Sequence, residues 1–466
     1  MLPLVVASVF ALVSHDRAYL RSEPKDAAAR LATLYAGDVL EVRGEKLGYV
    51  SVYDHRRERG GYVRAWQLRR YAIGDEALPA ELAAIVRFLK DSPGQESLGI
   101  GHAALYRKAA EAKAIDAQIL DAIGTMADRL ARRASRSSDE LLAAHLDVAA
   151  SYGLVFRSVD RGDKQVLCYD GQAFRQAMAL GGSGEVMLHA ATALMRAECV
   201  PIGSERERRE FDELRVSLIE RVPVEFLPDH LAARLHALSA GAHAALAFDR
   251  AREGKDEEAR RLALTAIDAL AKVDQRSLSD DDRGAYTESA LRVGAMRVLA
   301  EDPRPPLPGL HLAVEDGKAI GDRCLRLRGP KGELRGEACT FALPVASTIR
   351  ALPGGGSFAI AVLPLEGLRE LWILRAGEGG ALDVRVLSPS QEAPDLGYVE
   401  LAGTSPDGAK LAVAREAREK AGFLRRFEIV DRETAVVEKS AGSPSALTPF
   451  HKWQQAEWKA GTIALR

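Results

Sequence analysis

The chain has 466 residues, which is enough for two to four domains that each bury a core of their own. Its 64 basic and 66 acidic side chains give a net charge of −2, so no global field attracts nucleic acid, and 47% hydrophobic residues is typical of a folded protein. A basic run of Arg129, Arg132, Arg133 and Arg136 has helical spacing and acidic neighbours, and we interpret it as a solvated helix face.

The chain begins with an apolar run. Residues 2–13 are too few to span a bilayer, which takes about 20 residues, and no other segment predicts a transmembrane helix. The run lacks the basic segment that opens a signal peptide, so we interpret it as the start left by a removed signal peptide or as a truncated remnant of one. Either favours an exported protein, periplasmic or secreted. A plain first strand over Val9–Val13 is the alternative, and it requires no export.

Residues 9–71 alternate apolar and polar positions in short runs separated by turns, which predicts strands. The runs are residues 18–24 (Ala-Tyr-Leu-Arg-Ser-Glu-Pro), 34–42, 48–52 and 61–68. Their order resembles that of the bacterial SH3-like (SH3b) domain, and residues 18–24 stand where that family has its signature Leu-Asn-Val-Arg-Ser-Gly-Pro. The family usually has Trp where Tyr49 and Tyr62 stand, and Gly where Glu23 stands. The resemblance implies a small β-barrel over residues 1–72.

The same resemblance implies a binding face. Barrels of this family bind peptides or cell-wall peptides through aromatic side chains, which offer a large contact area and a polar handle. The candidate binding residues are Tyr19, Tyr49, Tyr53, Tyr62 and Trp66. The alternative is that these aromatic residues form the core of the barrel.

Residues 73–300 are predicted to be almost entirely helical. Residues 228–271 hold two apolar-periodic runs broken by Gly254, Lys255 and Asp256, which predicts a helical hairpin with small residues at the contact. Residues 245–266 resemble the tetratricopeptide repeat, whose period is about 34 residues. Helical hairpins of that family bind and organise partners.

The four cysteines divide into two local pairs. Cys168 opens an amphipathic segment and Cys199 ends the next one, so an antiparallel helical hairpin would bring them together. Cys324 and Cys339 flank a turn in an expected β-hairpin and could face each other across it. We predict disulfides Cys168–Cys199 and Cys324–Cys339, which favour an oxidising compartment. The alternative is four buried free thiols.

Residues 301–309 are rich in proline and predict a stiff linker. Beyond them the apolar period changes to two. Residues 352–362 with 370–374 parallel residues 405–414 with 426–430, and the Ser-Pro-Asp-Gly turn at residues 405–408 resembles the blade repeat of TolB-type and WD-repeat β-propellers. Residues 310–466 would supply three or four blades, so a small or incomplete propeller and a β-sandwich both stay open.

Residue spacing suggests no metal, cofactor or catalytic site. His236 and His243 share a helix face without an acidic residue at metal-binding spacing, and residues 279–284 are better interpreted as a helix start than as a cation loop. Gly354, Gly355 and Gly356 suggest a hairpin turn.

These patterns predict a multidomain α+β protein with an SH3-like barrel (1–72), a tetratricopeptide-like helical region (73–300), a linker (301–309) and a propeller-like β domain (310–466). The expected function is a non-catalytic scaffold or assembly subunit of the bacterial cell envelope that binds protein or peptide partners, with peptidoglycan as a further candidate and nucleic acid excluded. A peptidoglycan-binding cell-wall hydrolase, or its regulator, is the alternative. Oligomeric state is left open.

Overall fold

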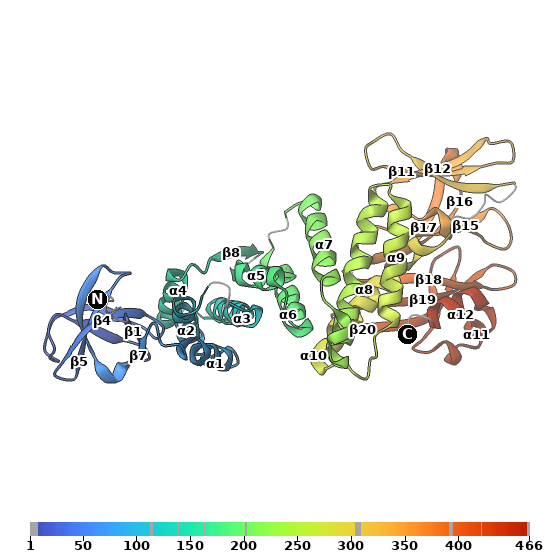
Figure 1. Ribbon diagram of the computed structural model, residues 1–466. Helices are drawn as coiled ribbons and strands as arrows, with labels where there is room; N and C mark the ends of the chain where they lie inside the picture. The colour runs from blue at the N-terminus through green and yellow to red at the C-terminus, as the bar shows by residue number, and fades with distance from the viewer. Residues whose placement is uncertain are drawn as a thin grey trace. The chain divides into compact units, whose positions relative to one another are not determined.

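The computed structural model describes residues 8–111, 115–137, 139–162, 164–200, 203–302, 309–390, 395–420 and 422–463. Helices and antiparallel sheets alternate along the chain, which makes the protein a mixed α+β structure (Figure 1). It divides into two compact units. We call Met1–Glu207 with Arg221–Phe226 the N-terminal unit, and Arg208–Glu220 with Leu227–Arg466 the C-terminal unit. The helices expected over residues 73–300 are divided between them.

The N-terminal unit opens with an antiparallel sheet of seven strands in the order β3-β2-β6-β5-β4-β1-β7. The strands are β1 Val9–Val13, β2 Ala18–Arg21, β3 Arg30–Leu34, β4 Val39–Lys46, β5 Tyr49–Asp54, β6 Arg59–Arg64 and β7 Leu68–Ala72. Alternate residues such as Leu20, Val50, Val52 and Val63 point into one apolar core. The expected first strand over Val9–Val13 is therefore present, and it lies inside the sheet.

The sheet is open, so the expectation of a closed barrel needs correction. Its edge strands β3 and β7 do not pair with each other within the described residues. Helices contact the sheet near the β3–β4 turn instead: the hydroxyl of Ser97 donates to the Ala36 carbonyl at 2.6 Å, and that of Tyr152 donates to the Gly37 carbonyl at 2.6 Å. Gly101 is needed at this contact, because a Cβ there would lie 2.4 Å from the Gly37 oxygen.

Helices form the remainder of the N-terminal unit, together with one β-hairpin. They are α1 Leu78–Lys90, α2 Glu96–Ala109, α3 Ala117–Ala134, α4 Glu140–Ser151, α5 Gln172–Leu180, α6 Gly184–Leu194 and the short η3 Ala197–Cys199, and the hairpin is β8 Phe156–Arg161 with β9 Lys164–Tyr169. The hairpin was not predicted, because in β8 only Val159 is buried and a period of two is not visible.

The first disulfide links β9 to η3. Cys168 and Cys199 are bonded, with their Cα atoms 5.6 Å apart. The predicted partners are correct, but the predicted setting is wrong: Cys168 lies near the end of a strand, and Cys199 lies in a short 3₁₀ helix after α6. The disulfide therefore ties the β8–β9 hairpin to the segment that follows α6.

The C-terminal unit contains the predicted helical hairpin, formed by α8 Asp229–Arg252 and α9 Asp256–Ala271. Gly254 closes the turn with a φ of 73°, which favours glycine. Small buried residues at the contact, such as Ala244 and Ala266, let the two helices approach closely. Helix α7, Glu205–Glu220, and helix α10, Asp280–Met296, flank the hairpin along the chain, and the short helix η5, Arg297–Ala300, follows α10.

Two sheets complete the C-terminal unit. The smaller has the order β10-β11-β12, and the larger joins two antiparallel meanders through a short parallel contact between β16 and β18. The strands are β10 His311–Asp316, β11 Arg323–Arg328, β12 Leu334–Thr340, β13 Leu343–Pro344, β14 Arg350–Ala351, β15 Ser357–Leu363, β16 Leu368–Ala376, β17 Leu382–Leu387, β18 Gly397–Thr404, β19 Lys410–Glu419, β20 Gly422–Asp431 and β21 Val437–Ala441, and helices α11 Thr448–Trp453 and α12 Ala456–Ile463 follow. Most of the expected linker, residues 303–308, lies outside the described residues.

The larger sheet packs against the helices of the same unit (Figure 1). Ala361 and Leu363 of β15 and Tyr398 of β18 share one apolar core with α8, α9 and α10. The two similar sequence segments occupy equivalent hairpins, β15–β16 and β19–β20. The second predicted disulfide is also present, since Cys324 and Cys339 lie directly opposite each other on β11 and β12.

A buried acidic residue lies where α7 packs against α8. Arg208 donates to Asp249 at 2.5 Å, and Asp212 lies close to the same guanidinium group. Burial raises the pKa of Asp249 to about 6, even though Arg208 opposes that shift. Asp249 is only 3% exposed, so water contributes little to stabilising its charge.

This raised pKa predicts a pH-dependent stability. Asp249 binds a proton in the folded state below about pH 6, whereas the unfolded chain binds it only below about pH 4. Its contribution to stability is therefore complete below about pH 4 and is lost as the pH rises through 6, by roughly 3 kcal/mol. We expect the wild type to lose stability relative to Asp249→Asn as the pH rises over this range. Urea titrations of both proteins at several pH values would measure this difference in the free energy of unfolding. Parallel pH profiles would contradict the assignment.

Candidate functional site

The four predicted tyrosines of the N-terminal sheet share one face. In β5, Val50 and Val52 point into the core, so Tyr49 and Tyr53 lie on the opposite face. Tyr62 alternates with the buried Val63 in β6, and Tyr19 alternates with buried neighbours in β2 in the same way. Cross-strand pairing places Arg21 opposite Tyr62, and Arg64 opposite Tyr49. The sheet therefore carries tyrosines and arginines together on the face turned away from its core.

Arginines lie against the tyrosine rings of this face. The guanidinium carbon of Arg30 lies 4.0 Å from the ring centroid of Tyr19, and that of Arg43 lies 4.0 Å from the centroid of Tyr53. Both distances fall within the range of cation–π attraction. We call Tyr19, Arg21, Arg30, Arg43, Tyr49, Tyr53, Tyr62 and Arg64 the Tyr/Arg face.

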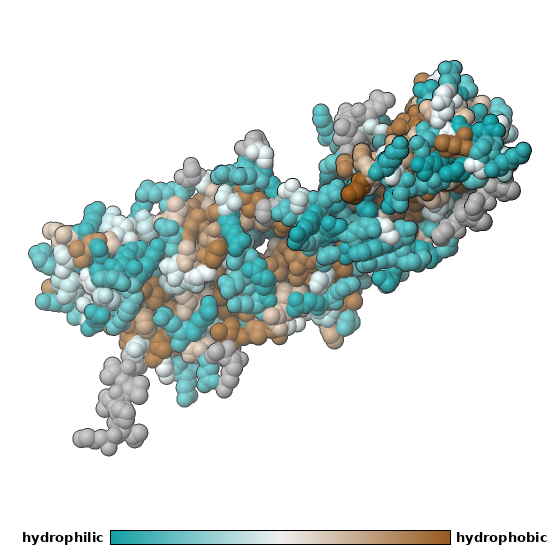
Figure 2. Space-filling view, turned by 90° about the horizontal axis from the view of Figure 1, so that it is seen from above, coloured by the Kyte–Doolittle hydropathy of each residue, from teal (hydrophilic) through white to brown (hydrophobic). Residues whose placement is uncertain are grey.

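Asp26 lies beside the Tyr/Arg face and accepts hydrogen bonds from two of its residues. The hydroxyl of Tyr49 donates to Asp26 at 2.5 Å, and Arg64 Nε donates to the same carboxylate at 2.9 Å. These hydrogen bonds lower the pKa of Asp26. Figure 2 shows that the end of the molecule formed by this sheet is mostly hydrophilic on the side in view, with scattered hydrophobic residues.

Trp66, the fifth predicted residue, lies apart from the Tyr/Arg face. It belongs to the short helix η1, Ala65–Gln67, between β6 and β7. Its side chain is 61% exposed, and its ring packs edge-on against His15 with centroids 4.9 Å apart. The structure therefore brings four of the five candidates onto one face.

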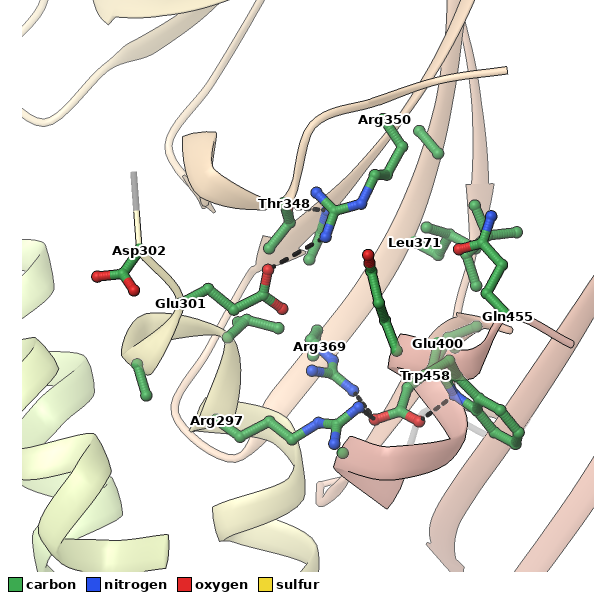
Figure 3. Close-up of a pocket in the computed structure, with 18 of the residues that line it drawn as sticks. Arg297, Glu301, Asp302, Thr348, Arg350, Arg369, Leu371, Glu400, Gln455 and Trp458 are labelled. Carbon is green, nitrogen blue, oxygen red and sulfur yellow. Dashed lines mark hydrogen bonds and ion pairs between the residues drawn. The ribbon is translucent and has the colours of Figure 1, made fainter. Parts of the chain in front are cut away.

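The C-terminal unit contains a cavity of about 670 Å³ (Figure 3). Its walls come from η5 and the two residues after it, from β14, β15, β16 and β18, and from α12. Apolar side chains such as Leu371 and Val399 line the cavity together with many polar and charged ones. The polar and charged lining residues are Arg297, Glu301, Asp302, Thr348, Arg350, Arg369, Glu400, Gln455, Glu457 and Trp458.

A buried charge cluster forms one wall of this cavity (Figure 3). Glu400 accepts from Arg369 at 2.6 Å, from Arg297 at 2.7 Å and from the indole nitrogen of Trp458 at 2.8 Å. Burial opposes ionisation of Glu400, but the two guanidinium groups outweigh it and hold its pKa below the usual range. The carboxylate is therefore ionised, and we call Arg297, Arg369, Glu400 and Trp458 the Glu400 cluster.

A second pair lies at another part of the cavity wall. Arg350 donates to Glu301 at 3.2 Å, and Asp302 accepts from Arg260. Most of the charged groups that line the cavity are thus paired, some with one another and Asp302 with a residue outside the lining. A cavity of this volume can hold a small ligand.

Comparisons with known proteins leave the family open. No profile of a known protein family and no curated protein matches this chain. The resemblances to the SH3-like domain, the tetratricopeptide repeat and the propeller blade therefore stay predictions. Within the described residues, no helix combines the length and the apolar character required to cross a membrane.

Within the described residues, one group of potential metal ligands lies close enough together to hold an ion. Two of its members are joined by a covalent bond. Asp322, Cys324 and Cys339 place their ligand atoms within 4.8 Å of one another. Both thiols belong to a disulfide, which removes the thiolates that a metal would need. Of the two histidines noted in the sequence, His243 has a partner on its own helix. It bonds the Ser239 carbonyl at 2.8 Å.

Sequence reasoning missed the Glu400 cluster. Arg369 and Glu400 lie 31 positions apart on different strands, so no local spacing links them. A signal was nevertheless available: Arg369 shares its strand face with Leu371 and Ile373, where a polar residue is unexpected. A charged residue at an inward strand position indicates a buried partner elsewhere in the chain.

Proposed function

We propose that this protein is a non-catalytic interaction scaffold of the bacterial cell envelope, periplasmic or secreted, which binds a peptide or protein partner on the Tyr/Arg face. The observation that carries the proposal is one sheet face on which four arginines lie with the partly exposed Tyr19, Tyr53 and Tyr62, while Tyr49 is buried there at 7% exposure. Tyrosine and arginine are enriched among the residues that dominate binding energy at interfaces.

The two disulfides support the proposed compartment. All four cysteines are paired, and disulfides persist in oxidising environments such as the periplasm. The resemblance of residues 18–68 to the SH3b domain supports the envelope as the setting, because domains of that family bind peptides and cell-wall peptides. On this proposal the α8–α9 hairpin acts as a tetratricopeptide-like surface and the paired meanders as blades of a small propeller.

The charge of the Tyr/Arg face indicates the chemistry of the partner. Its four arginines exceed the neighbouring carboxylates, Asp26 and Glu41, by two charges. A peptide that carries carboxylates would pair with the arginines and stack on the tyrosine rings. Peptidoglycan stem peptides have this chemistry, so sacculi are the first probe to use.

The test measures both the binding of the protein to purified sacculi and any hydrolysis of the sacculi. We expect the protein to sediment with purified sacculi, and acidic peptides to compete with this binding. The double variant Arg43→Ala/Tyr53→Ala should weaken binding at least about tenfold, since each lost stacking contact contributes about 1 kcal/mol.

The matched control is Arg87→Ala/Phe88→Ala, which removes an arginine and an exposed aromatic ring from α1. It should bind sacculi as the wild type does. Equal binding by both double variants would contradict the Tyr/Arg face as the site. Release of soluble muropeptides from the sacculi would instead support the alternative, a cell-wall hydrolase.

A further inference from the structure

A basic pocket of about 440 Å³ lies in the N-terminal unit, apart from the Tyr/Arg face. It forms where the end of α3, the start of β9 and the segment between α6 and η3 meet. Arg132 and Arg136 come from the first of these, Lys164 from the second, and Arg196 from the third. Three segments that are distant in sequence thus bring four cationic side chains to one hollow.

The pocket has an excess of positive charge. Glu198 is the one carboxylate among its described lining residues. Arg132 and Arg196 also share Asp128, which leaves four cations against two carboxylates and a net charge of +2. Neither Arg136 nor Lys164 has a carboxylate partner among the residues that the structure describes. Convergent like charges repel, and a bound anion would relieve that repulsion.

The frame around these cations is firmly held. The disulfide Cys168–Cys199 joins β9 to η3, on either side of the pocket. Leu167 N donates to the hydroxyl of Ser135 at 2.8 Å, which fixes β9 to the end of α3. Arg161 donates to the Val200 carbonyl at 2.5 Å, so β8 is tied to the segment after η3. These bonds hold in place the backbone segments that carry the cations, which lowers the entropy cost of ordering those segments on binding.

The dipole of helix α3 explains the presence of only some of the four cations in this pocket. Cations near a helix C-terminus are stabilised by the last carbonyl groups, and this accounts for Arg132 and Arg136 at the end of α3. It does not account for Lys164 and Arg196, which come from a strand and from a separate loop. The interpretation of the run Arg129, Arg132, Arg133 and Arg136 as a solvated helix face is incomplete, because Arg129 and Arg133 bond the buried Glu96.

We propose that this pocket binds a tetrahedral oxyanion, a phosphate or phosphoryl group, independently of the function proposed for the Tyr/Arg face. Guanidinium groups bind phosphate oxygens in bidentate fashion, and lysine adds a compact charge. The phosphoryl group could belong to a free phosphate compound or to a phosphorylated lipid headgroup, and both present the same chemistry.

The first measurement is calorimetric titration of the full-length oxidised protein with inorganic phosphate at low ionic strength. We expect saturable binding, weakened at least about tenfold in Arg136→Ser/Lys164→Ser, because each lost charge-assisted bond contributes about 1.5 kcal/mol. The control Arg283→Ser/Lys318→Ser removes the same two charges from exposed positions of the C-terminal unit, and it should bind phosphate as the wild type does.

A second measurement distinguishes the source of the phosphoryl group. Flotation with vesicles of phosphatidylcholine, alone or mixed with phosphatidylglycerol, tests the headgroup. Binding only to the mixed vesicles, lost in Arg136→Ser/Lys164→Ser, would assign the site to a lipid, whereas phosphate binding without flotation would assign it to a free compound. The proposal is overturned if phosphate does not bind at millimolar concentration, if the two double variants behave alike, or if acetate binds as well as phosphate.

Discussion

Replacing Glu400 with alanine should lower the free energy of unfolding by about 3 to 5 kcal/mol, because the change leaves two guanidinium groups without their shared anion. Arg369 is 2% exposed, so water cannot replace the lost partner. Trp458 also loses its acceptor, and its indole fluorescence gives a local readout. Urea titrations followed by tryptophan fluorescence and circular dichroism would measure the loss.

Two further variants separate charge from packing. Glu433→Ala removes an exposed carboxylate that pairs with Arg375, and it should change the unfolding free energy by less than about 1 kcal/mol. Arg369→Met combined with Glu400→Leu should recover part of the stability, since apolar replacements of buried ion pairs are often tolerated. A Glu400→Ala protein as stable as Glu433→Ala would show that the Glu400 cluster is not buried in solution.

Removing the Cys168–Cys199 disulfide is expected to have the second large effect. The bond closes a loop of 31 residues, and loop closure of that length stabilises the folded state by about 4 kcal/mol. Cys168→Ala/Cys199→Ala should therefore unfold at a lower urea concentration than the wild type. The same variant should bind phosphate more weakly, because the bond braces the basic pocket.

The second disulfide provides the comparison. Cys324–Cys339 closes only 15 residues, so its removal should cost less, about 3 kcal/mol, and should leave phosphate binding unchanged. Thiol counting on protein from an oxidising compartment should find no free thiol, in keeping with the paired cysteines of the structure. Equal stability of the oxidised and fully reduced proteins would contradict a structural role for both bonds.

Features that depend on neighbouring residues were predictable. The α8–α9 hairpin followed from helical periodicity and from Gly254, whose positive φ suits a helix end. The β19 strand followed from the Ser-Pro-Asp-Gly turn, where Gly408 adopts a φ of 69°. The SH3b resemblance had suggested Tyr49 and Tyr53 for one binding face, and the alternation of β5 does place them on the same face. In each case the signal lies within a few residues, where backbone sterics and side-chain periodicity act directly.

Only the tertiary structure decided the rest. The sequence by itself determined the mixed α+β class and the cysteine partners. The tertiary structure left the N-terminal sheet open, divided the helices between two units, and set Cys168 on a strand. It also brought Arg369 to Glu400, and Lys164 to Arg136. These contacts join segments that local propensity cannot relate, because their free energy arises from burial and charge pairing when the whole unit folds.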